Sequence, residues 1–153
     1  MTVLDKILKL LDEENIVYEK VEHEPVYTSE DAAKIRDTGL SMGAKALILF
    51  ADNTPILVVV PGDKKLDFNL FKKLFSVKDL RMASREEVYK LTGLEVGSIP
   101  PIGKALNLPS YYSRDFEKKD QVAFNAAMHT VSIKMKAPDL LKLENPVIGD
   151  FSK

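Results

Sequence analysis

At 153 residues, with 45% hydrophobic and 29% charged side chains, the chain can bury a substantial core as one domain over residues 1–153. It has no cysteine and only two histidines, His23 and His129. This excludes a disulfide framework, a thiol nucleophile and a zinc ribbon, and it argues against a metal site. The net charge of −1 disfavours a grip on a long stretch of nucleic acid, which depends on cations that neutralise phosphates.

No apolar run approaches the roughly 20 residues that cross a bilayer, and the start lacks the layout of a secretory signal. We therefore expect a soluble, cytoplasmic protein with no membrane partner, and a monomer because no coiled-coil pattern is present. Cationic side chains concentrate in residues 61–90 and predict either a modest phosphate-facing patch or a solvated helical face. They are Lys64, Lys65, Lys72, Lys73, Lys78, Arg81 and Arg85.

The first 40 residues predict two helices and a strand. Apolar residues at Leu4, Ile7, Leu8 and Leu11 have helical spacing, and residues 16–21 are short and β-prone. The segment 28–31 reads Thr-Ser-Glu-Asp, a capping box that begins a second helix, which Gly39 or the turn beyond it ends.

The middle of the chain predicts a hairpin followed by two helices. Two apolar runs, 44–50 and 56–60, flank the turn residues 52–55, which favours an antiparallel pair buried on both faces. Asp67 begins a helix that carries Phe68, Phe71 and Phe75. A second capping box at residues 84–87 begins a helix that ends near Gly93.

Residues 96–109 are rich in Gly and Pro and predict an irregular loop, which Ile99 and Ile102 attach to the body. Residues 121–125 and 130–135 then predict strands, and 138–141 a short helix with Pro near its first turn. Strands and helices mix without a βαβ rhythm. We therefore predict an α+β domain built on a mixed, mainly antiparallel sheet surrounded by helices.

The familiar motifs for phosphate binding, dinucleotide binding, serine hydrolysis and zinc proteolysis are absent from the sequence. Lys45 interrupts an apolar strand, where it is either surface-facing or an ammonium placed in a pocket. The loop from Gly97 to Gly103 is either a structural turn or a set of backbone N–H groups for a developing oxyanion.

Three further polar residues are candidates with equally open interpretations. His129 lines a pocket or is a satisfied edge histidine, and His23 lies between two glutamates near the surface. Asn125 ends a strand, where its amide orders a turn or binds a substrate carbonyl. None of these residues decides the function alone.

Taken together, six segments resemble the YbaK and prolyl-tRNA-editing family in order and spacing. They are residues 23–33, beginning His23-Glu-Pro-Val-Tyr-Thr28; 43–49, beginning Gly43-Ala-Lys45; 59–67; 81–87; 92–103, with Gly97-Ser-Ile-Pro-Pro101; and 124–129, Phe124-Asn-Ala-Ala-Met-His129. The resemblance spans about residues 18 to 140. It departs from the family at 125–127, which reads Asn-Ala-Ala where the family commonly has Asn-Ala-Gly.

The resemblance implies a YbaK-like α+β fold and hydrolysis of a wrong amino acid from tRNA, often tRNA for proline. Lys45 matches the family lysine that positions the terminal adenosine and the ester. Gly97, Ser98 and Ile99 match the loop whose amides hold the aminoacyl carbonyl. Five residues are expected to bind substrate: His23, Thr28, Pro101, Asn125 and, as a residue that helps to choose the amino acid, His129.

The implied mechanism is attack by water, assisted by the ribose 2′-hydroxyl of the substrate, without metal or cofactor. The expected partner is the acceptor end of a mischarged tRNA, with the choice of tRNA left partly to an aminoacyl-tRNA synthetase or another partner. Alanine on tRNA for proline is the first substrate candidate, from His129 and the bulky Ile35 and Leu47. Two alternatives remain open: a non-catalytic module of the same fold that binds tRNA or a synthetase, and an unrelated small-molecule hydrolase.

Overall fold

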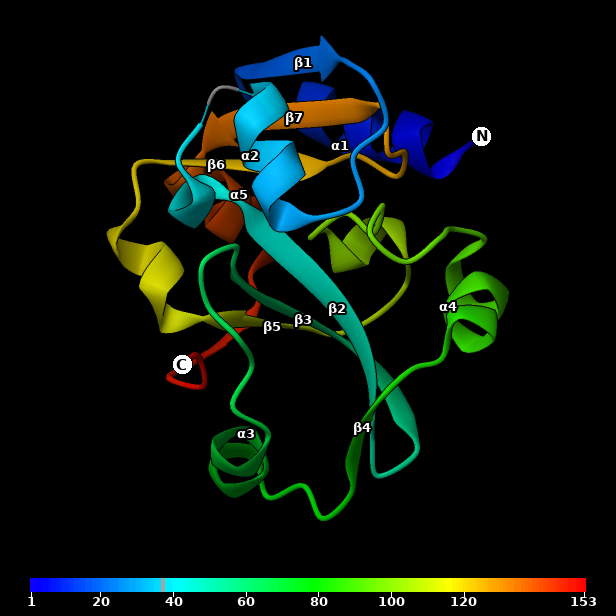
Figure 1. The fold of residues 1–153 in the computed structure, drawn as a ribbon, viewed down its shortest axis with the longest axis vertical. Helices are drawn as coiled ribbons and strands as arrows, with labels where there is room; N and C mark the ends of the chain where they lie inside the picture. Colours follow the sequence, from blue (N-terminus) through cyan, green and yellow to red (C-terminus); the bar gives the residue numbers. More distant parts are fainter. Residues whose placement is uncertain (37) are drawn as a thin grey trace.

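The computed structural model describes residues 1–36 and 38–153 and shows two β-sheets with helices around them (Figure 1). A three-stranded sheet has the order β1-β7-β6, and a five-stranded sheet has the order β4-β2-β3-β5-β8. Four strand pairs are antiparallel, and β3–β5 and β5–β8 are parallel. This is the predicted α+β class with a mainly antiparallel pairing, although it forms two sheets where one was expected.

The α-helices are α1 (Val3–Glu13), α2 (Ser29–Arg36), α3 (Phe68–Phe75), α4 (Arg85–Thr92) and α5 (Ala137–Glu144). The strands are β1 (Tyr18–Glu22), β2 (Ala44–Ala51), β3 (Thr54–Pro61), β4 (Leu80–Met82), β5 (Ser110–Ser113), β6 (Gln121–Asn125), β7 (Val131–Lys136) and β8 (Val147–Gly149). Three short 3-10 helices are η1 (Leu40–Met42), η2 (Gly103–Ala105) and η3 (Arg114–Lys118). No helix in the described part of the chain is long and apolar enough to span a membrane.

The β2–β3 hairpin is the central element of the fold. Its turn places Asp52 and Asn53 at positive φ, the conformation that tight hairpins require and that Asp and Asn tolerate. Along β3, Leu57 and Val59 belong to one buried cluster, and Ile56, Val58 and Val60 to another. Because successive side chains of a strand point to opposite faces, β3 separates two hydrophobic cores.

The local sequence signals for helices are confirmed. Thr28 Oγ accepts from the Asp31 N–H at the start of α2, Asp67 caps α3, and Ser84 and Glu87 form a reciprocal capping box on α4. Gly93 follows α4 at a φ of 72°. The three-residue strands β4 and β8 and the parallel strand β5 were not predicted.

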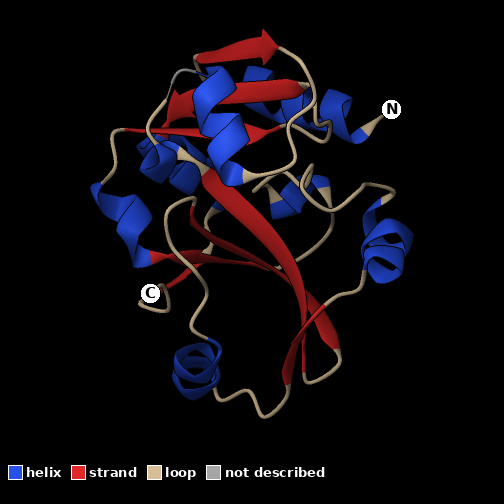
Figure 2. Ribbon diagram, in the orientation of Figure 1, coloured by secondary structure: helices blue, strands red, loops and turns tan. Residues whose placement is uncertain are grey.

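The two sheets meet at one end of β2. A parallel bridge joins Gly43 to Ala123 of β6, so the start of β2 lies beside the three-stranded sheet. Figure 2 shows β2 running from this junction, beside α2, to the hairpin turn at the opposite end of the molecule. The junction therefore brings α2, β2 and β6 together.

Candidate active site

A pocket of about 220 Å³ opens at the junction of the two sheets. Its walls are α2 with the two residues before it, the first residues of β2, the end of β6, and the loop at residues 96–99. Those walls bring together Thr28, Lys45, Gly97, Ile99 and Asn125, which are far apart in sequence. The volume lies below the roughly 300 Å³ at which sites for drug-sized ligands begin, so the pocket suits a small chemical group.

Lys45 enters the pocket from β2. Its Nζ donates a hydrogen bond of 2.9 Å to the carbonyl oxygen of Lys64, which holds the ammonium on the pocket wall. Burial lowers the pKa of Lys45 below its ordinary value, and the carboxylate of Glu30 opposes part of that change. The strand lysine therefore belongs to the pocket and is not a plain surface side chain.

Gly97 supplies the sharpest backbone feature of the pocket. Its φ is 93°, and a Cβ at this position would lie 3.1 Å from Cε1 of His129. Glycine is needed both for the positive φ and for the close approach of the histidine ring. The loop therefore depends on glycine at position 97, because a side chain there would press against His129.

The peptide groups of the loop are held from two sides. The Gly97 carbonyl accepts from Asn125 Nδ2 at 2.9 Å, and the Ser98 N–H donates to the Glu95 carbonyl at 3.1 Å. The Ser98 carbonyl accepts from the Ala127 N–H at 3.0 Å. In a trans peptide the N–H points away from the carbonyl, so the Ile99 N–H is directed away from Ala127.

The far end of the loop is fastened to the core. The hydroxyl of Tyr112 donates to the Pro101 carbonyl, and the Gly103 N–H donates to Oε2 of Glu144 at 2.6 Å. Glu144 is buried, and burial raises the pKa of its carboxyl. Ile99 and Ile102 are buried as predicted, so the loop is rigid and apolar on its inner side.

His129 contacts the loop from outside the pocket. Its Nδ1 is 3.0 Å from the Val26 carbonyl, and its ring packs against the ring of Tyr27 at an interplanar angle of 40°, with centroids 4.5 Å apart. Tyr27 lines the pocket and leaves 67% of its surface exposed. The histidine therefore supports the pocket edge through Tyr27 and Gly97.

His23 and Asn125 are connected on the three-stranded sheet. Nε2 of His23 lies 2.7 Å from Oγ of Ser132, and that hydroxyl lies 3.3 Å from Oδ1 of Asn125. Ser132 is completely buried and lies directly opposite Asn125 in the β6–β7 pair. His23 thus reaches the pocket loop through two other side chains.

Residues 23–143 match the model of a family described as the aminoacyl-tRNA editing domain, which is most of the chain. The chain belongs to the aminoacyl-tRNA editing family. It is 31% identical over 157 residues to the Multifunctional Ser/Thr-tRNA deacylase ProXp-y of Escherichia coli (strain K12). The matched region covers 97% of this chain and 92% of that protein.

The chain is also similar to a second curated protein and, in fold, to a solved structure. The proline–tRNA ligase of Solidesulfovibrio magneticus is 36% identical over 98 residues, covering 63% of this chain and 17% of the ligase. A crystal structure described as a candidate trans-editing enzyme for prolyl-tRNA synthetase superposes with a TM-score of 0.85 at 23% identity, covering 100% and 98% of the two chains, and shares the fold. The family consists of aminoacyl-tRNA deacylases, which hydrolyse the ester of mischarged tRNA.

The structure separates the nine residues expected from the family resemblance into two groups. Five line the pocket: Thr28, Lys45, Gly97, Ile99 and Asn125. Four do not: His23, Ser98, Pro101 and His129. The second group contacts the first or the loop itself, because Ser98 and Pro101 hold the loop and the two histidines support its neighbours.

Arg36 is the charged residue of the pocket that the sequence reasoning missed. Arg36 lines the pocket, is 7% exposed, and its Nη1 is buried without a hydrogen-bond partner among the described residues. Burial lowers its pKa to about 10. Its spacing of three and four residues from Ala33 and Ala32, which are buried on the same helix, could have indicated that Arg36 faces inwards.

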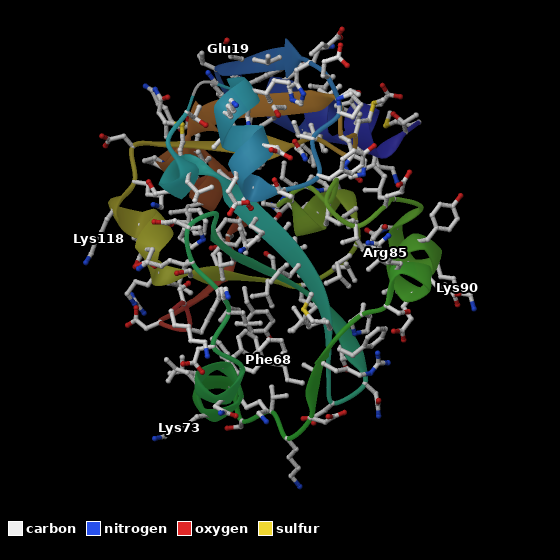
Figure 3. All side chains as sticks on the ribbon, in the orientation of Figure 1. Glu19, Phe68, Lys73, Arg85, Lys90 and Lys118 are labelled. Atoms are coloured by element: carbon white, nitrogen blue, oxygen red, sulfur yellow. The ribbon has the colours of Figure 1, made fainter. Side chains whose placement is uncertain are left out.

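The cationic residues of segment 61–90 do not lie together. Some lie on α3, β4 and α4, whereas Lys64, Lys65 and Lys78 lie in the loops that flank α3, and Figure 1 shows α3 and α4 on opposite sides of the molecule. Arg81 pairs with Glu87 and Lys64 with Asp115. In Figure 3 the side chains of Lys73 and Lys90 point outwards from their helices. These residues therefore fit the alternative of solvated helical faces.

Proposed function

We propose that the chain edits mischarged tRNA in trans by hydrolysing the ester between a small amino acid and the terminal ribose. The observation that carries this proposal is one small pocket into which the Lys45 ammonium and the shaped backbone at Gly97 converge. A chain with no cysteine and no motif for a nucleophilic serine has to rely on position and electrostatics.

In this proposal the N–H groups of Gly97 and Ile99 hold the aminoacyl carbonyl as negative charge develops on it. Neither N–H has a hydrogen-bond partner among the described residues, whereas the N–H of Ser98 is already bonded to Glu95. Ser98 therefore positions the loop without touching the ester. The Lys45 ammonium contacts the terminal ribose on the side that carries its phosphate. The 2′-hydroxyl of the substrate assists the attacking water.

The rest of the terminal nucleotide stays outside the pocket, since about 220 Å³ suits only the aminoacyl group. The exposed ring of Tyr27 offers a stacking surface for the terminal base, a common way to hold unpaired nucleotides. The modest charge of the chain is consistent with contacts to the acceptor end alone. Choice of the tRNA then depends partly on a synthetase.

Alanine on tRNA for proline is the first substrate candidate, because the pocket is small and the bulky Leu47 lines it. Ile35, the other bulky residue of that argument, does not line it. Serine and threonine are the second candidates, favoured by the polar lining at Thr28, Ser29 and Asn125 and by the substrates named for the Escherichia coli relative. A polar pocket discriminates more strongly through a substrate hydroxyl than through one methylene.

The test is deacylation of Ala-, Ser-, Thr-, Cys- and Pro-tRNA by the wild type, by Lys45→Ala and by the matched control Lys73→Ala. Lys73 is an outward-pointing lysine on α3, away from the pocket (Figure 3). We expect one or two mischarged tRNAs to be hydrolysed by the wild type and the control, and at least about a hundredfold slower by Lys45→Ala. If a folded wild type hydrolysed none of them, the proposal would give way to a non-catalytic tRNA-binding module.

A further inference from the structure

A chain of polar side chains connects the outer strand of the small sheet to the pocket loop. It runs from His23 through Ser132 and Asn125 to the carbonyl oxygen of Gly97, with contacts of 2.7, 3.3 and 2.9 Å. Residues 23 and 132 are separated by 109 positions in sequence. Because Ser132 is fully buried, water cannot replace any partner that its hydroxyl loses.

Simple hydrogen-bonding rules orient the side chain of Asn125 in this series. The Gly97 carbonyl can only accept, so the amide nitrogen of Asn125 faces it and Oδ1 of Asn125 faces Ser132. The Ser132 hydroxyl donates to Oδ1 at 3.3 Å, and its oxygen lies 2.7 Å from Nε2 of His23. Nδ1 of His23 lies 2.7 Å from the Glu24 carbonyl, another pure acceptor, so Nδ1 donates there.

We propose that Ser132 and His23 are positioning residues that set the orientation of the oxyanion-binding loop through Asn125. The inference rests on the proposed deacylase function. Asn125 holds the Gly97 carbonyl, while Glu95 holds the N–H of the same peptide group. With this peptide fixed at both ends, the flanking N–H groups of Gly97 and Ile99 stay directed at the substrate before it binds.

Removal of the Ser132 hydroxyl frees the side chain of Asn125 to rotate away from Gly97. The loop remains in place, since Tyr112 and Glu144 fasten its far end. The expected loss therefore falls on the transition state and not on substrate binding. We expect Ser132→Ala to lower kcat about tenfold, the equivalent of one lost hydrogen bond, with KM unchanged.

The linear connection through Ser132 makes a sharper prediction for double variants. His23→Leu should lower kcat as Ser132→Ala does, and His23→Gln should restore most of it because the Gln amide can hydrogen-bond the Ser132 hydroxyl either as donor or as acceptor. Since His23 acts only through Ser132, the double variant Ser132→Ala with His23→Leu should be no slower than Ser132→Ala alone. Multiplied effects in the double variant would contradict the proposal.

The matched control is Ser113→Ala, which removes another buried serine hydroxyl, one bonded to Asp115 away from the pocket. It should keep the wild-type kcat even if its thermal stability falls as much as that of Ser132→Ala. The NMR signal of the Asn125 side-chain NH2 should shift in Ser132→Ala and not in Ser113→Ala. An unchanged Asn125 signal in Ser132→Ala overturns the positioning role of Ser132, whether or not a substrate is known. A shifted signal together with an inactive wild type overturns only the deacylase proposal.

Discussion

The pocket and the aromatic cluster beside α3 are built on opposite principles. Around Phe71, the rings of Phe75, Tyr111 and Phe151 lie 4.7, 5.2 and 5.1 Å away by their centroids, and Phe71 is fully buried. The contacts that stabilise this cluster are apolar and aromatic. The pocket instead contains a half-buried ammonium, a buried guanidinium and a glycine at positive φ.

The difference shows that the pocket contains groups that lower the stability of the folded chain. In the described residues, four buried side-chain atoms lack a hydrogen-bond partner, and two of them, Arg36 Nη1 and His129 Nε2, belong to side chains that adjoin the pocket or its loop. A buried polar atom without a partner costs about 1–3 kcal/mol. The aromatic cluster offsets such costs at a distance, so changes in the two regions should separate stability from activity.

The largest change in stability is expected from Phe71→Ala in the aromatic cluster. Loss of a fully buried ring from a packed cluster costs about 3–5 kcal/mol. Deacylation at a temperature where the variant is still folded should remain near the wild-type rate, because Phe71 does not line the pocket. Denaturant unfolding measures the first effect, and Phe71→Leu is the milder control. A selective loss of activity in folded Phe71→Ala would contradict the view that the aromatic cluster contributes to stability and not to activity.

Gly97→Ala and Gly93→Ala form a matched pair for backbone strain. Both glycines have positive φ, 93° and 72°, but a Cβ at Gly93 meets nothing within 4 Å, whereas at Gly97 it meets the ring of His129. Each variant should lose about 1–2 kcal/mol of unfolding free energy. Only Gly97→Ala should also lose at least about tenfold in kcat. Equal activity of the two variants would show that the loop shape does not matter for the reaction.

Arg36→Met tests the buried guanidinium on the pocket wall. The change removes a cation that burial disfavours and retains most of its volume, so unfolding free energy should rise by up to about 1 kcal/mol. If the guanidinium contacts an oxygen of the substrate, kcat/KM should fall by about tenfold. Higher stability with lower activity would confirm that the buried guanidinium lowers the stability of the protein and contributes to activity. Lower stability would mean that Arg36 is a structural residue.

The sequence predicted those parts of the fold that nearby residues determine. The capping residues Ser84 and Glu87, the N-cap Asp67 and the turn at Asp52-Asn53 each act within four residues, and all were found at their predicted places. The strands β5 and β8 depend on parallel pairing with remote segments, and β4 and β8 are too short to show periodicity. Local patterns carry no information about such pairings.

The same distinction holds for the site. Lys45, Gly97 and Asn125 were predicted through motifs, and the structure brings all three to one pocket. Ser132 and Arg36 were not predicted, because an ordinary strand serine and helix arginine gain their importance only from burial and from contacts across the fold. Their chemistry is visible in three dimensions and not in spacing.

The smallest expected effect belongs to Ala127, the position where the family commonly has glycine. Ala127 has a φ of 71°, so the chain keeps the backbone conformation of the missing glycine at the expense of strain. Ala127→Gly should therefore raise the unfolding free energy by about 0.5–1 kcal/mol, measured by denaturant unfolding. Its N–H still donates to Ser98, so the loop and kcat should be unchanged. If the substitution stabilised the protein but slowed deacylation, the backbone strain at Ala127 would contribute to the shape of the pocket. The stability lost in this region would then include strain in the backbone behind the loop.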